Sequence, residues 1–289
     1  MKKSSMTEVF VRARAHAESS AAGLQERNRL WWEQLPMTYV DWDKTARGVS
    51  TGQQFALLEG QFLEGNPWLK GFPFSAFHNQ RVLEIGCGSG VASCLFTKHG
   101  AKVTAIDLTE CAVRTARANA SAQWLALDVV AMDAEKLRFE ADSFDYVFSW
   151  GVLHHSANAN LTFAEAARVL RPGGGGMFMV YHKSSLRYYV RGLQWLILKG
   201  KLFRGHNLDT VQRFFTDGYY HRHFTAAELV AALGVAGLEV DRVEVSHMNT
   251  RMIPYLPKAW VDVLKRNWGW LLIAQFSKQR VSRRSATPA

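Results

Sequence analysis

The chain has 289 residues, 48% of them hydrophobic, which is enough to bury the core of one large domain. Its three cysteines, Cys87, Cys94 and Cys111, lack Cys-x-x-Cys spacing, which excludes a disulfide framework and a structural zinc site and favours a reducing cytoplasm. No signal peptide is expected, and no apolar run approaches the ~20 residues that span a bilayer. The net charge of +10 favours an anionic substrate, an acidic membrane surface or nucleic acid as partner, or else reflects a solvated basic face.

Aromatic side chains crowd the segment from Glu18 to Leu63, where Trp31, Trp32 and Trp42 lie around Pro36. This segment lacks the alternation of strand and helix patterns that follows it. We expect one or two helices and a connecting loop ahead of the main sheet. The aromatic rings either pack against that sheet, which is the commoner arrangement, or face a bound ligand.

A short apolar strand followed by a glycine-rich loop starts at Arg81. Residues 82–85 read as a strand buried on both faces, and residues 91–99 have helical spacing. Between them, Gly86, Gly88 and Gly90 let the backbone turn tightly and approach a ligand. A dinucleotide fingerprint would need glycine where Val91 stands, and a P-loop would end in Gly-Lys-Ser/Thr, so neither pattern is met.

Acidic residues follow the next two predicted strands. Residues 101–106 form the second strand, and Asp107 at its end either accepts two ribose hydroxyls or helps to start the next helix, where Thr109 is the better cap. The third predicted strand, residues 127–132, is followed by Asp133. We therefore expect these acids at the carboxyl edge of a parallel sheet.

The fourth and fifth predicted strands cover residues 144–150 and 177–181. The helix between them, residues 163–170, ends at Arg-Pro-Gly-Gly, because proline and glycine cannot continue it. The additional Gly175 and Gly176 are expected to loosen that turn.

The pattern Glu84-x-Gly86-x-Gly88-x-Gly90 resembles the first motif of the class I S-adenosylmethionine-dependent methyltransferases. Asp107, the Asp-Ala-Glu stretch that begins at Asp133, and Leu-Arg-Pro-Gly-Gly extend the resemblance over residues 81–174. The resemblance implies S-adenosylmethionine as cofactor, with Asp107 on the ribose and Asp133 on the adenine; Asp128 remains a competitor for the adenine. The cofactor-binding residues that it implies are Glu84, Gly86, Cys87, Gly88, Gly90, Asp107, Leu108, Asp133, Ala134 and Trp150.

Three candidate catalytic residues follow the fourth and fifth strands: His155, Tyr181 and His182. An imidazole titrates near neutral pH, so His155 can act as a base, although such residues are more often structural. The resemblance implies methyl transfer to a small-molecule or lipid-like acceptor, with oxygen slightly preferred over nitrogen or carbon. A donor-binding regulatory module without turnover and a methyltransferase acting on a macromolecule are the alternatives.

A basic amphipathic helix is predicted over residues 186–203, either as a lid over the site or as an interfacial helix on acidic lipid. Thr225 and Glu228 form a capping box for a helix over residues 226–236. Strands at residues 238–245 and 268–276 complete the pattern.

We therefore predict an α/β, doubly wound, Rossmann-like seven-stranded sheet whose last strands form an antiparallel hairpin, with helical lid additions. Residues 1–78 form an aromatic helical lid segment, residues 79–276 the methyltransferase domain with insertions 183–223 and 247–267, and residues 277–289 a basic flexible tail. An anionic acceptor and peripheral contact with the inner face of a membrane are open alternatives. No metal and no nucleic acid are expected, and the oligomeric state is left undetermined.

Overall fold

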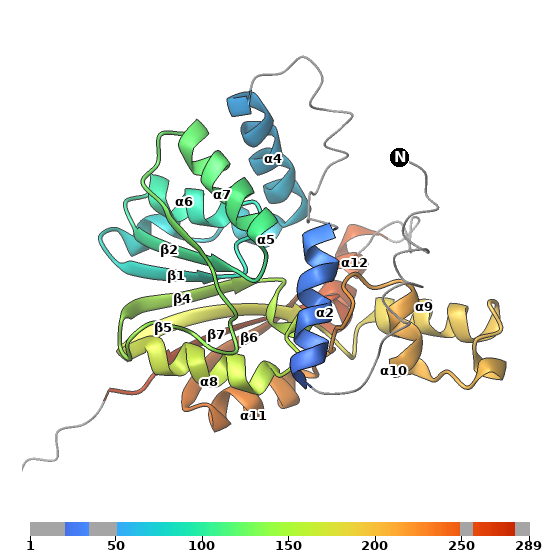
Figure 1. Ribbon diagram of the computed structural model, residues 1–289. Coiled ribbons are helices and arrows are strands. Elements are labelled where there is room, and N and C mark those ends of the chain that lie inside the picture. Colours follow the sequence, from blue (N-terminus) through green and yellow to red (C-terminus); the bar gives the residue numbers. More distant parts are fainter. Residues whose placement is uncertain (1–20, 35–50, 249–256, 281–289) are drawn as a thin grey trace, which may run out of the picture.

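The computed structural model describes residues 21–34, 51–248 and 257–280 (Figure 1). Its centre is a seven-stranded sheet in the order β3-β2-β1-β4-β5-β7-β6, with β7 antiparallel to both of its neighbours and the other strands parallel. The strands are β1 (Arg81–Ile85), β2 (Lys102–Asp107), β3 (Asp128–Ala131), β4 (Phe144–Trp150), β5 (Leu170–Tyr181), β6 (Leu238–Ser246) and β7 (Leu271–Lys278). The predicted fold class, including the terminal antiparallel hairpin, is confirmed.

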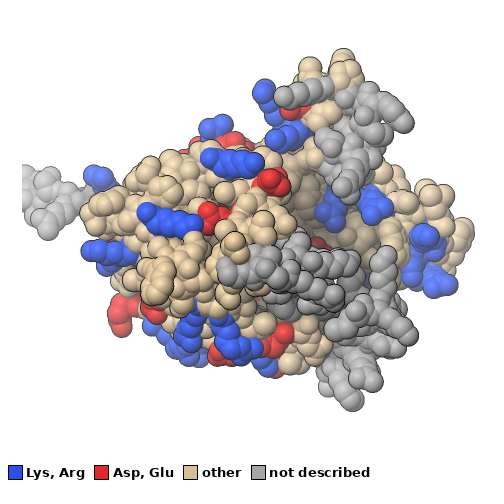
Figure 2. Space-filling model, turned by 90° about the horizontal axis from the view of Figure 1, so that it is seen from above, with Lys and Arg blue, Asp and Glu red and all other residues tan. Residues whose placement is uncertain are grey.

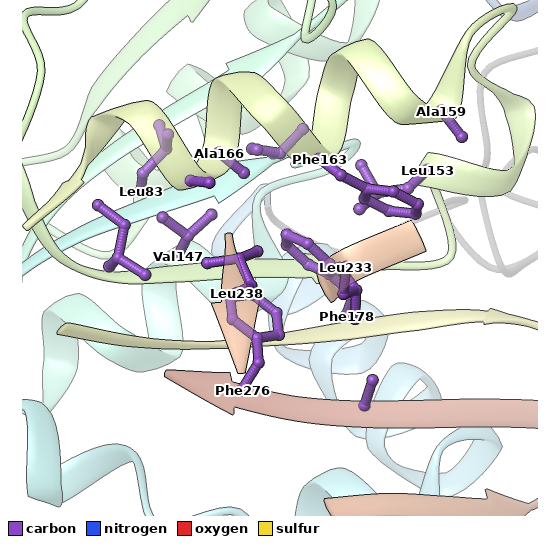
Figure 3. Close-up of a cluster of buried hydrophobic side chains, with 14 of the residues drawn as sticks. Leu83, Val147, Leu153, Ala159, Phe163, Ala166, Phe178, Leu233, Leu238 and Phe276 are labelled. Carbon is purple, nitrogen blue, oxygen red and sulfur yellow. The ribbon is translucent and has the colours of Figure 1, made fainter. Parts of the chain in front are cut away.

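Helices cover both faces of the sheet, as a parallel sheet with two apolar faces requires (Figure 1). One face packs against α4 (Thr51–Gly65), α5 (Pro67–Lys70) and α6 (Val91–Lys98). The other face packs against α8 (Ala159–Val169) and α11 (Ala226–Val235). Figure 3 shows the second core, in which Leu83, Val147, Phe163, Leu233 and Phe276 converge from strands and helices.

The fifth strand is longer than expected, because the glycine run continues it. Phe144 pairs with Leu170 and Tyr146 with Gly175, so residues 171–174 form an irregularity opposite a single residue of β4. A side chain at Gly176 would place its Cβ 2.4 Å from the ring of Phe276. Gly176 therefore admits the ring of Phe276 in β7, and both additional glycines continue β5 rather than loosening the turn.

Apart from α7, the remaining helices lie outside the strand-helix alternation. α2 (Ala21–Gln34) and η1 (Phe74–Phe77) precede the sheet, α7 (Glu110–Ala122) joins β2 to β3, and η2 (Leu153–His155) follows β4. Between β5 and α11 lie α9 (Leu186–Ile197), η3 (Leu202–Arg204), α10 (Leu208–Val211) and η4 (Gln212–Phe214), and α12 (Lys258–Trp268) precedes β7.

The boundaries of the basic helix and of the final strand also differ from the prediction. The basic helix ends at Ile197 rather than Phe203, because the chain turns through Gly200 at a φ of 61°. Trp268 is the last residue of α12 and not the start of the final strand. The capping box is confirmed, since Thr225 Oγ1 accepts from the Glu228 N–H and the Glu228 carboxylate accepts from the Thr225 N–H.

Candidate active site

The glycine loop after β1 contains three glycines with positive φ, and the space around their Cα atoms differs. A Cβ at Gly86 would lie 2.3 Å from Val152 Cγ2, and a Cβ at Gly90 would lie 2.8 Å from the Cβ of Ala116. A Cβ at Gly88 would meet no atom within 4 Å. Close packing therefore requires the first and third glycines, whereas the second leaves open space in front of the backbone.

Asp107 lies at the end of β2, opposite this loop. Its Oδ2 accepts the Gly88 N–H at 3.0 Å, and its Oδ1 accepts the Thr109 N–H and hydroxyl at 3.0 and 2.9 Å. Burial raises the pKa of Asp107, and the hydrogen bonds from Thr109 and Gly88 partly offset this. Thr109 caps α7 by accepting from the Ala112 N–H, as expected. The carboxylate thus ties the glycine loop to the start of α7.

A cavity of about 510 Å³ lies against both features. Its volume is within the roughly 300–1,000 Å³ range of small-molecule sites. The predicted site residues in its wall are Glu84, Gly86, Cys87, Gly88, Asp107, Leu108, Ala134, Trp150 and His155. The predicted residues outside its wall are Gly90, Asp133, Tyr181 and His182.

Residues of two N-terminal helices also line the cavity, and no sequence motif identified them. They are Gln25, Asn28 and Trp32 of α2 and Phe55, Leu58 and Phe62 of α4. Their sequence signal was the aromatic-rich character of the segment around Trp31 and Trp32. Residues 35–50, with the expected Pro36 and Trp42 cluster, lie outside the described part of the chain.

Helix α2 is attached to the cavity rim by side-chain hydrogen bonds. Gln25 Nε2 donates to Asp133 Oδ1 at 2.9 Å, and Gln25 Oε1 accepts the Ala157 N–H at 3.1 Å. Asn28 Nδ2 donates to the His155 carbonyl at 2.7 Å, and Asn28 Oδ1 accepts the Tyr220 N–H at 3.1 Å. Two amide side chains of one helix therefore connect three loops that follow different strands.

The two candidate adenine acids occupy opposite ends of β3. Asp128 is the first residue of that strand and is exposed, whereas Asp133 follows its last residue. The carboxyl ends of parallel strands share one edge, so Asp133 lies on the side of Gly88 and Asp107. Asp133 Oδ1 also accepts the Glu135 N–H at 2.9 Å.

Glu84 is buried in β1 and forms part of the cavity wall. The hydroxyl of Ser93 donates to its carboxylate. Burial raises the pKa of Glu84 to about 8, which the Ser93 hydrogen bond partly counteracts. Glu84 is therefore largely protonated at neutral pH in the folded chain.

His155 forms part of the cavity wall at the end of η2. Its Nδ1 lies 2.8 Å from the Tyr220 carbonyl, and the edge of the Trp32 ring meets it at a centroid distance of 5.0 Å. A carbonyl only accepts, so Nδ1 carries the hydrogen and Nε2 carries the lone pair. Burial lowers the pKa of His155 to about 4, and the ring is neutral at physiological pH.

The other two candidate catalytic residues point in different directions at the end of β5. The centroid of the Tyr181 ring lies 3.7 Å from that of the His154 ring and 5.7 Å from that of the His155 ring. His182 is buried, with Nδ1 2.9 Å from the Gly269 carbonyl. The structure therefore brings Tyr181 and His155 together and places His182 against the end of α12.

The cavity fits the cofactor that the sequence resemblance implied. The open space at Gly88 accommodates a ligand against the backbone, and Asp107 supplies carboxylate oxygens for hydroxyl groups at the same place. Phe55, Leu58 and Phe62 supply apolar surface for a flat ring system.

Comparison with known proteins supports this interpretation. Residues 83–178 match the model of a methyltransferase domain. A ubiquinone biosynthesis O-methyltransferase of Nitrosococcus oceani is 28% identical over 59% of this chain and 68% of its own length. One from Maricaulis maris is 32% identical over 45% of this chain and 51% of its own length, so the chain spans about half of that relative.

Solved structures agree in fold. An S-adenosylmethionine-dependent methyltransferase from Mesorhizobium loti has a TM-score of 0.52 at 23% identity, covering 73% of this chain and 96% of its own. One from Methanosarcina mazei has a TM-score of 0.53 at 21% identity, covering 72% of this chain and 98% of its own. With the ordered motifs and the strand order, the domain match shows a class I methyltransferase domain over residues 83–178, whose cofactor is S-adenosylmethionine.

Proposed function

We propose that this chain transfers a methyl group from S-adenosylmethionine to a hydroxyl oxygen of a small molecule. The observation that carries the proposal is the composition of one cavity wall. The glycine loop and Asp107 lie in the same wall as His155, a neutral imidazole whose Nε2 carries the lone pair. Two relatives are named O-methyltransferases, which favours oxygen over nitrogen or carbon as the atom methylated.

On the donor side, Asp107 would hold the ribose hydroxyls and the Gly88 backbone would approach the ligand closely. Asp133 and Ala134 would hold the adenine, with Gln25 orienting the Asp133 carboxylate. The donor supplies an electrophilic methyl group on a positively charged sulfur. The protein then has to position the acceptor and remove its proton.

On the acceptor side, we assign His155 the role of accepting the hydroxyl hydrogen at Nε2. The Tyr220 carbonyl and the Trp32 ring fix the tautomer and the orientation of this imidazole. Tyr181 is the second candidate, because its ring lies beside His154 and His155. His182 is the weakest of the three, since Nδ1 is engaged with Gly269.

The proposal is tested by incubating the protein with methyl-labelled S-adenosylmethionine and a cell extract, which is then separated into organic, small-aqueous and macromolecular fractions. We expect label in the organic or small-aqueous fraction and strongly reduced transfer by His155→Ala. Label in the macromolecular fraction would instead indicate a methyltransferase acting on a macromolecule. Binding of S-adenosylhomocysteine without any transfer would favour a regulatory module.

The pH dependence of this transfer tests the His155 assignment. Because the folded pKa of His155 is about 4, protonation should not reduce activity between pH 8 and pH 6. An ordinary histidine would produce an inflection near 6.5. Such an inflection, absent from the His155→Ala variant, would contradict the neutral buried imidazole.

We also propose that α9 and η3 rest on an acidic membrane surface, at the inner face of the cytoplasmic membrane. Leu198 and Phe203 are 75% and 89% exposed, and Lys199, Lys201 and Arg204 lie among them. Figure 2 shows basic side chains gathered on this projecting part of the molecule. Exposed apolar side chains interleaved with cations are typical of interfacial helices. No helix in the described ranges has the length and apolarity needed to cross a membrane.

Sedimentation with vesicles of anionic or of zwitterionic lipid tests the membrane proposal. We expect binding to the anionic vesicles alone, and loss of binding in the double variant Leu198→Ser, Phe203→Ser. Val235→Ser is the matched control, because Val235 is 90% exposed at the end of α11, away from α9. Equal sedimentation of the double variant and the control would refute the proposal.

A further inference from the structure

Arg187 lies in the first turn of α9 and has an unusual environment for a guanidinium group. Its Cζ lies 4.2 Å from the centroid of the Trp270 ring, and Nη2 donates to the Phe215 carbonyl at 3.2 Å. No Asp or Glu in the described part of the chain forms an ion pair with it, although Tyr181 and Asp217 interact with it electrostatically. Burial lowers the pKa of Arg187.

A partly buried cation without a counter-ion is costly, because it has left water without gaining a charge partner. Three half-exposed arginines, by contrast, have a carboxylate partner. Arg81 and Arg171 both pair with Asp145, and Arg168 pairs with Glu165. The exception at Arg187 is therefore a feature that a bound anion would explain.

Histidines with unpartnered ring nitrogens lie near Arg187. In the described part of the chain, both ring nitrogens of His154, Nδ1 of His221 and Nε2 of His223 are buried without a hydrogen-bond partner. The His221 and His223 rings are 5.3 Å apart. Burial lowers the pKa of all three, so each ring is neutral and offers one donor and one acceptor.

These orphan atoms point to a polar ligand, since native proteins rarely leave buried polar groups unpaired. A metal ion is not the ligand that their arrangement suggests. Within residues 21–34, 51–248 and 257–280, no group of three or more His, Cys, Asp or Glu side chains is placed to hold one. Neutral imidazoles beside a guanidinium instead suit an oxyanion.

A continuous row of rings connects this cluster to the donor cavity. Tyr181 lies 5.7 Å from His155, which forms part of the cavity wall, and 4.6 Å from Trp270. The guanidinium of Arg187 covers that same Trp270 ring. The two ends of the row, His155 and Arg187, come from loops and helices that follow β4 and β5 at the carboxyl edge of the sheet.

We propose that Arg187, with His221 and His223, binds a carboxylate or phosphate group of the methyl acceptor. This inference rests on the proposed function, because it places the reacting hydroxyl of the acceptor at His155 and the anionic group at the far end of the row. Arg187 is a positioning residue in this arrangement. A guanidinium forms two parallel hydrogen bonds with such an oxyanion, which orients it as well as holding it.

The test measures anion binding to the protein loaded with S-adenosylhomocysteine, by titration calorimetry and saturation-transfer NMR. The probes are benzoate, inorganic phosphate and the neutral analogue benzamide. We expect saturable binding of benzoate or phosphate, and about tenfold or weaker binding of benzamide. Benzoate binding would indicate a carboxylate acceptor, and binding of phosphate alone would indicate a phosphorylated one.

Arg187→Gln should remove the binding of the anion, whereas Arg191→Gln should retain it. Arg191 is the matched control, because it lies one turn further along α9 and is exposed. If Arg187→Gln fails to fold, Arg187→Lys takes its place. This variant keeps the charge but lacks the planar guanidinium, and it should bind the anion more weakly than wild type. Unchanged S-adenosylhomocysteine affinity in each variant verifies the donor site.

Three outcomes would overturn the inference. They are no saturable binding of either anion to the wild type, equal binding of benzamide, and full anion binding by Arg187→Gln. Each can be told apart from failure of the proposed function, which would appear as loss of S-adenosylhomocysteine binding or as absence of methyl transfer in the extract assay. In that assay, the labelled product should be retained on an anion exchanger.

Discussion

The proposed donor half and the proposed acceptor half of this site are built in different ways. In the donor half, Gly88 and Asp107 are 19 residues apart, and they lie just after β1 and at the end of the adjacent parallel strand β2. In the acceptor half, His155, Tyr181 and Trp270 meet although they are distant in the chain. A site that consists of one strand-loop-helix unit and its neighbour leaves a local pattern, whereas a site assembled from separate loops does not.

Helix α2 joins the two halves. Gln25 reaches Asp133, 108 residues away in the sequence, and Asn28 reaches the carbonyl of His155. The donor half therefore depends on a helix that its motifs do not include. Changes at the strand ends, at the loop and at α2 should accordingly have effects of different sizes.

The largest expected effect is at Glu84, in the strand between the two halves. The folded pKa is about 8 against an ordinary value of 4.5, so the folded chain keeps a proton that the unfolded chain loses. This proton stabilises the folded chain fully below pH 4.5. The free energy of unfolding then decreases by about 5 kcal/mol in total as the pH rises to about 8. Urea unfolding of wild type and Glu84→Gln at several pH values measures it. A pH dependence that is unchanged in Glu84→Gln would disprove the buried, protonated carboxyl.

Gly86→Ala should disturb both halves at once, because the new Cβ would lie 2.3 Å from Val152 in the loop after β4. Positive φ and overpacking together should cost about 2–4 kcal/mol of unfolding free energy. Gly88→Ala is the matched comparison, since its Cβ meets no atom within 4 Å. It should cost only about 1 kcal/mol while weakening donor binding. Thermal unfolding and S-adenosylhomocysteine titration separate the two, and equal destabilisation would contradict this distinction.

Asp107→Ala tests the donor half alone. Loss of the hydrogen bonds that a carboxylate would make to two hydroxyls should weaken S-adenosylhomocysteine binding about 100-fold. Asp128→Ala is the control, because that acid is exposed at the opposite end of β3. Calorimetric titration of both variants gives the comparison. A similar loss of S-adenosylhomocysteine affinity in the two variants would show that Asp107 is not the acid that binds the ribose.

The smallest expected effect is at the connection through α2. Gln25→Ala removes the hydrogen bonds to Asp133 and to the Ala157 N–H, which should weaken S-adenosylhomocysteine binding about tenfold with little change in stability. Arg29→Ala on the same helix breaks only an exposed pair with Glu26 and should have no effect on binding. Identical affinities for the two variants would show that α2 does not support the donor half.

The sequence alone determined the sheet, the glycine loop and the acid at the end of β2. Strand patterns, turn-forming glycines and helix caps are encoded within a few residues, and parallel strands bring their carboxyl ends to one edge. For this reason the strand order and the position of Asp107 followed from local patterns, and only boundaries such as the start of β5 differed.

Tertiary structure alone decided which distant side chains share a cavity wall. No spacing links Gln25 to Asp133 or Arg187 to Trp270, because these contacts depend on where packing places α2, α9 and α12 relative to the sheet. Tertiary structure also gave Tyr181 and His182, which follow one another in sequence, different neighbours: Tyr181 lies beside His155, and His182 lies against Gly269. The chemistry of methyl donation was therefore readable in the sequence, and the environment of the acceptor was readable only in the fold.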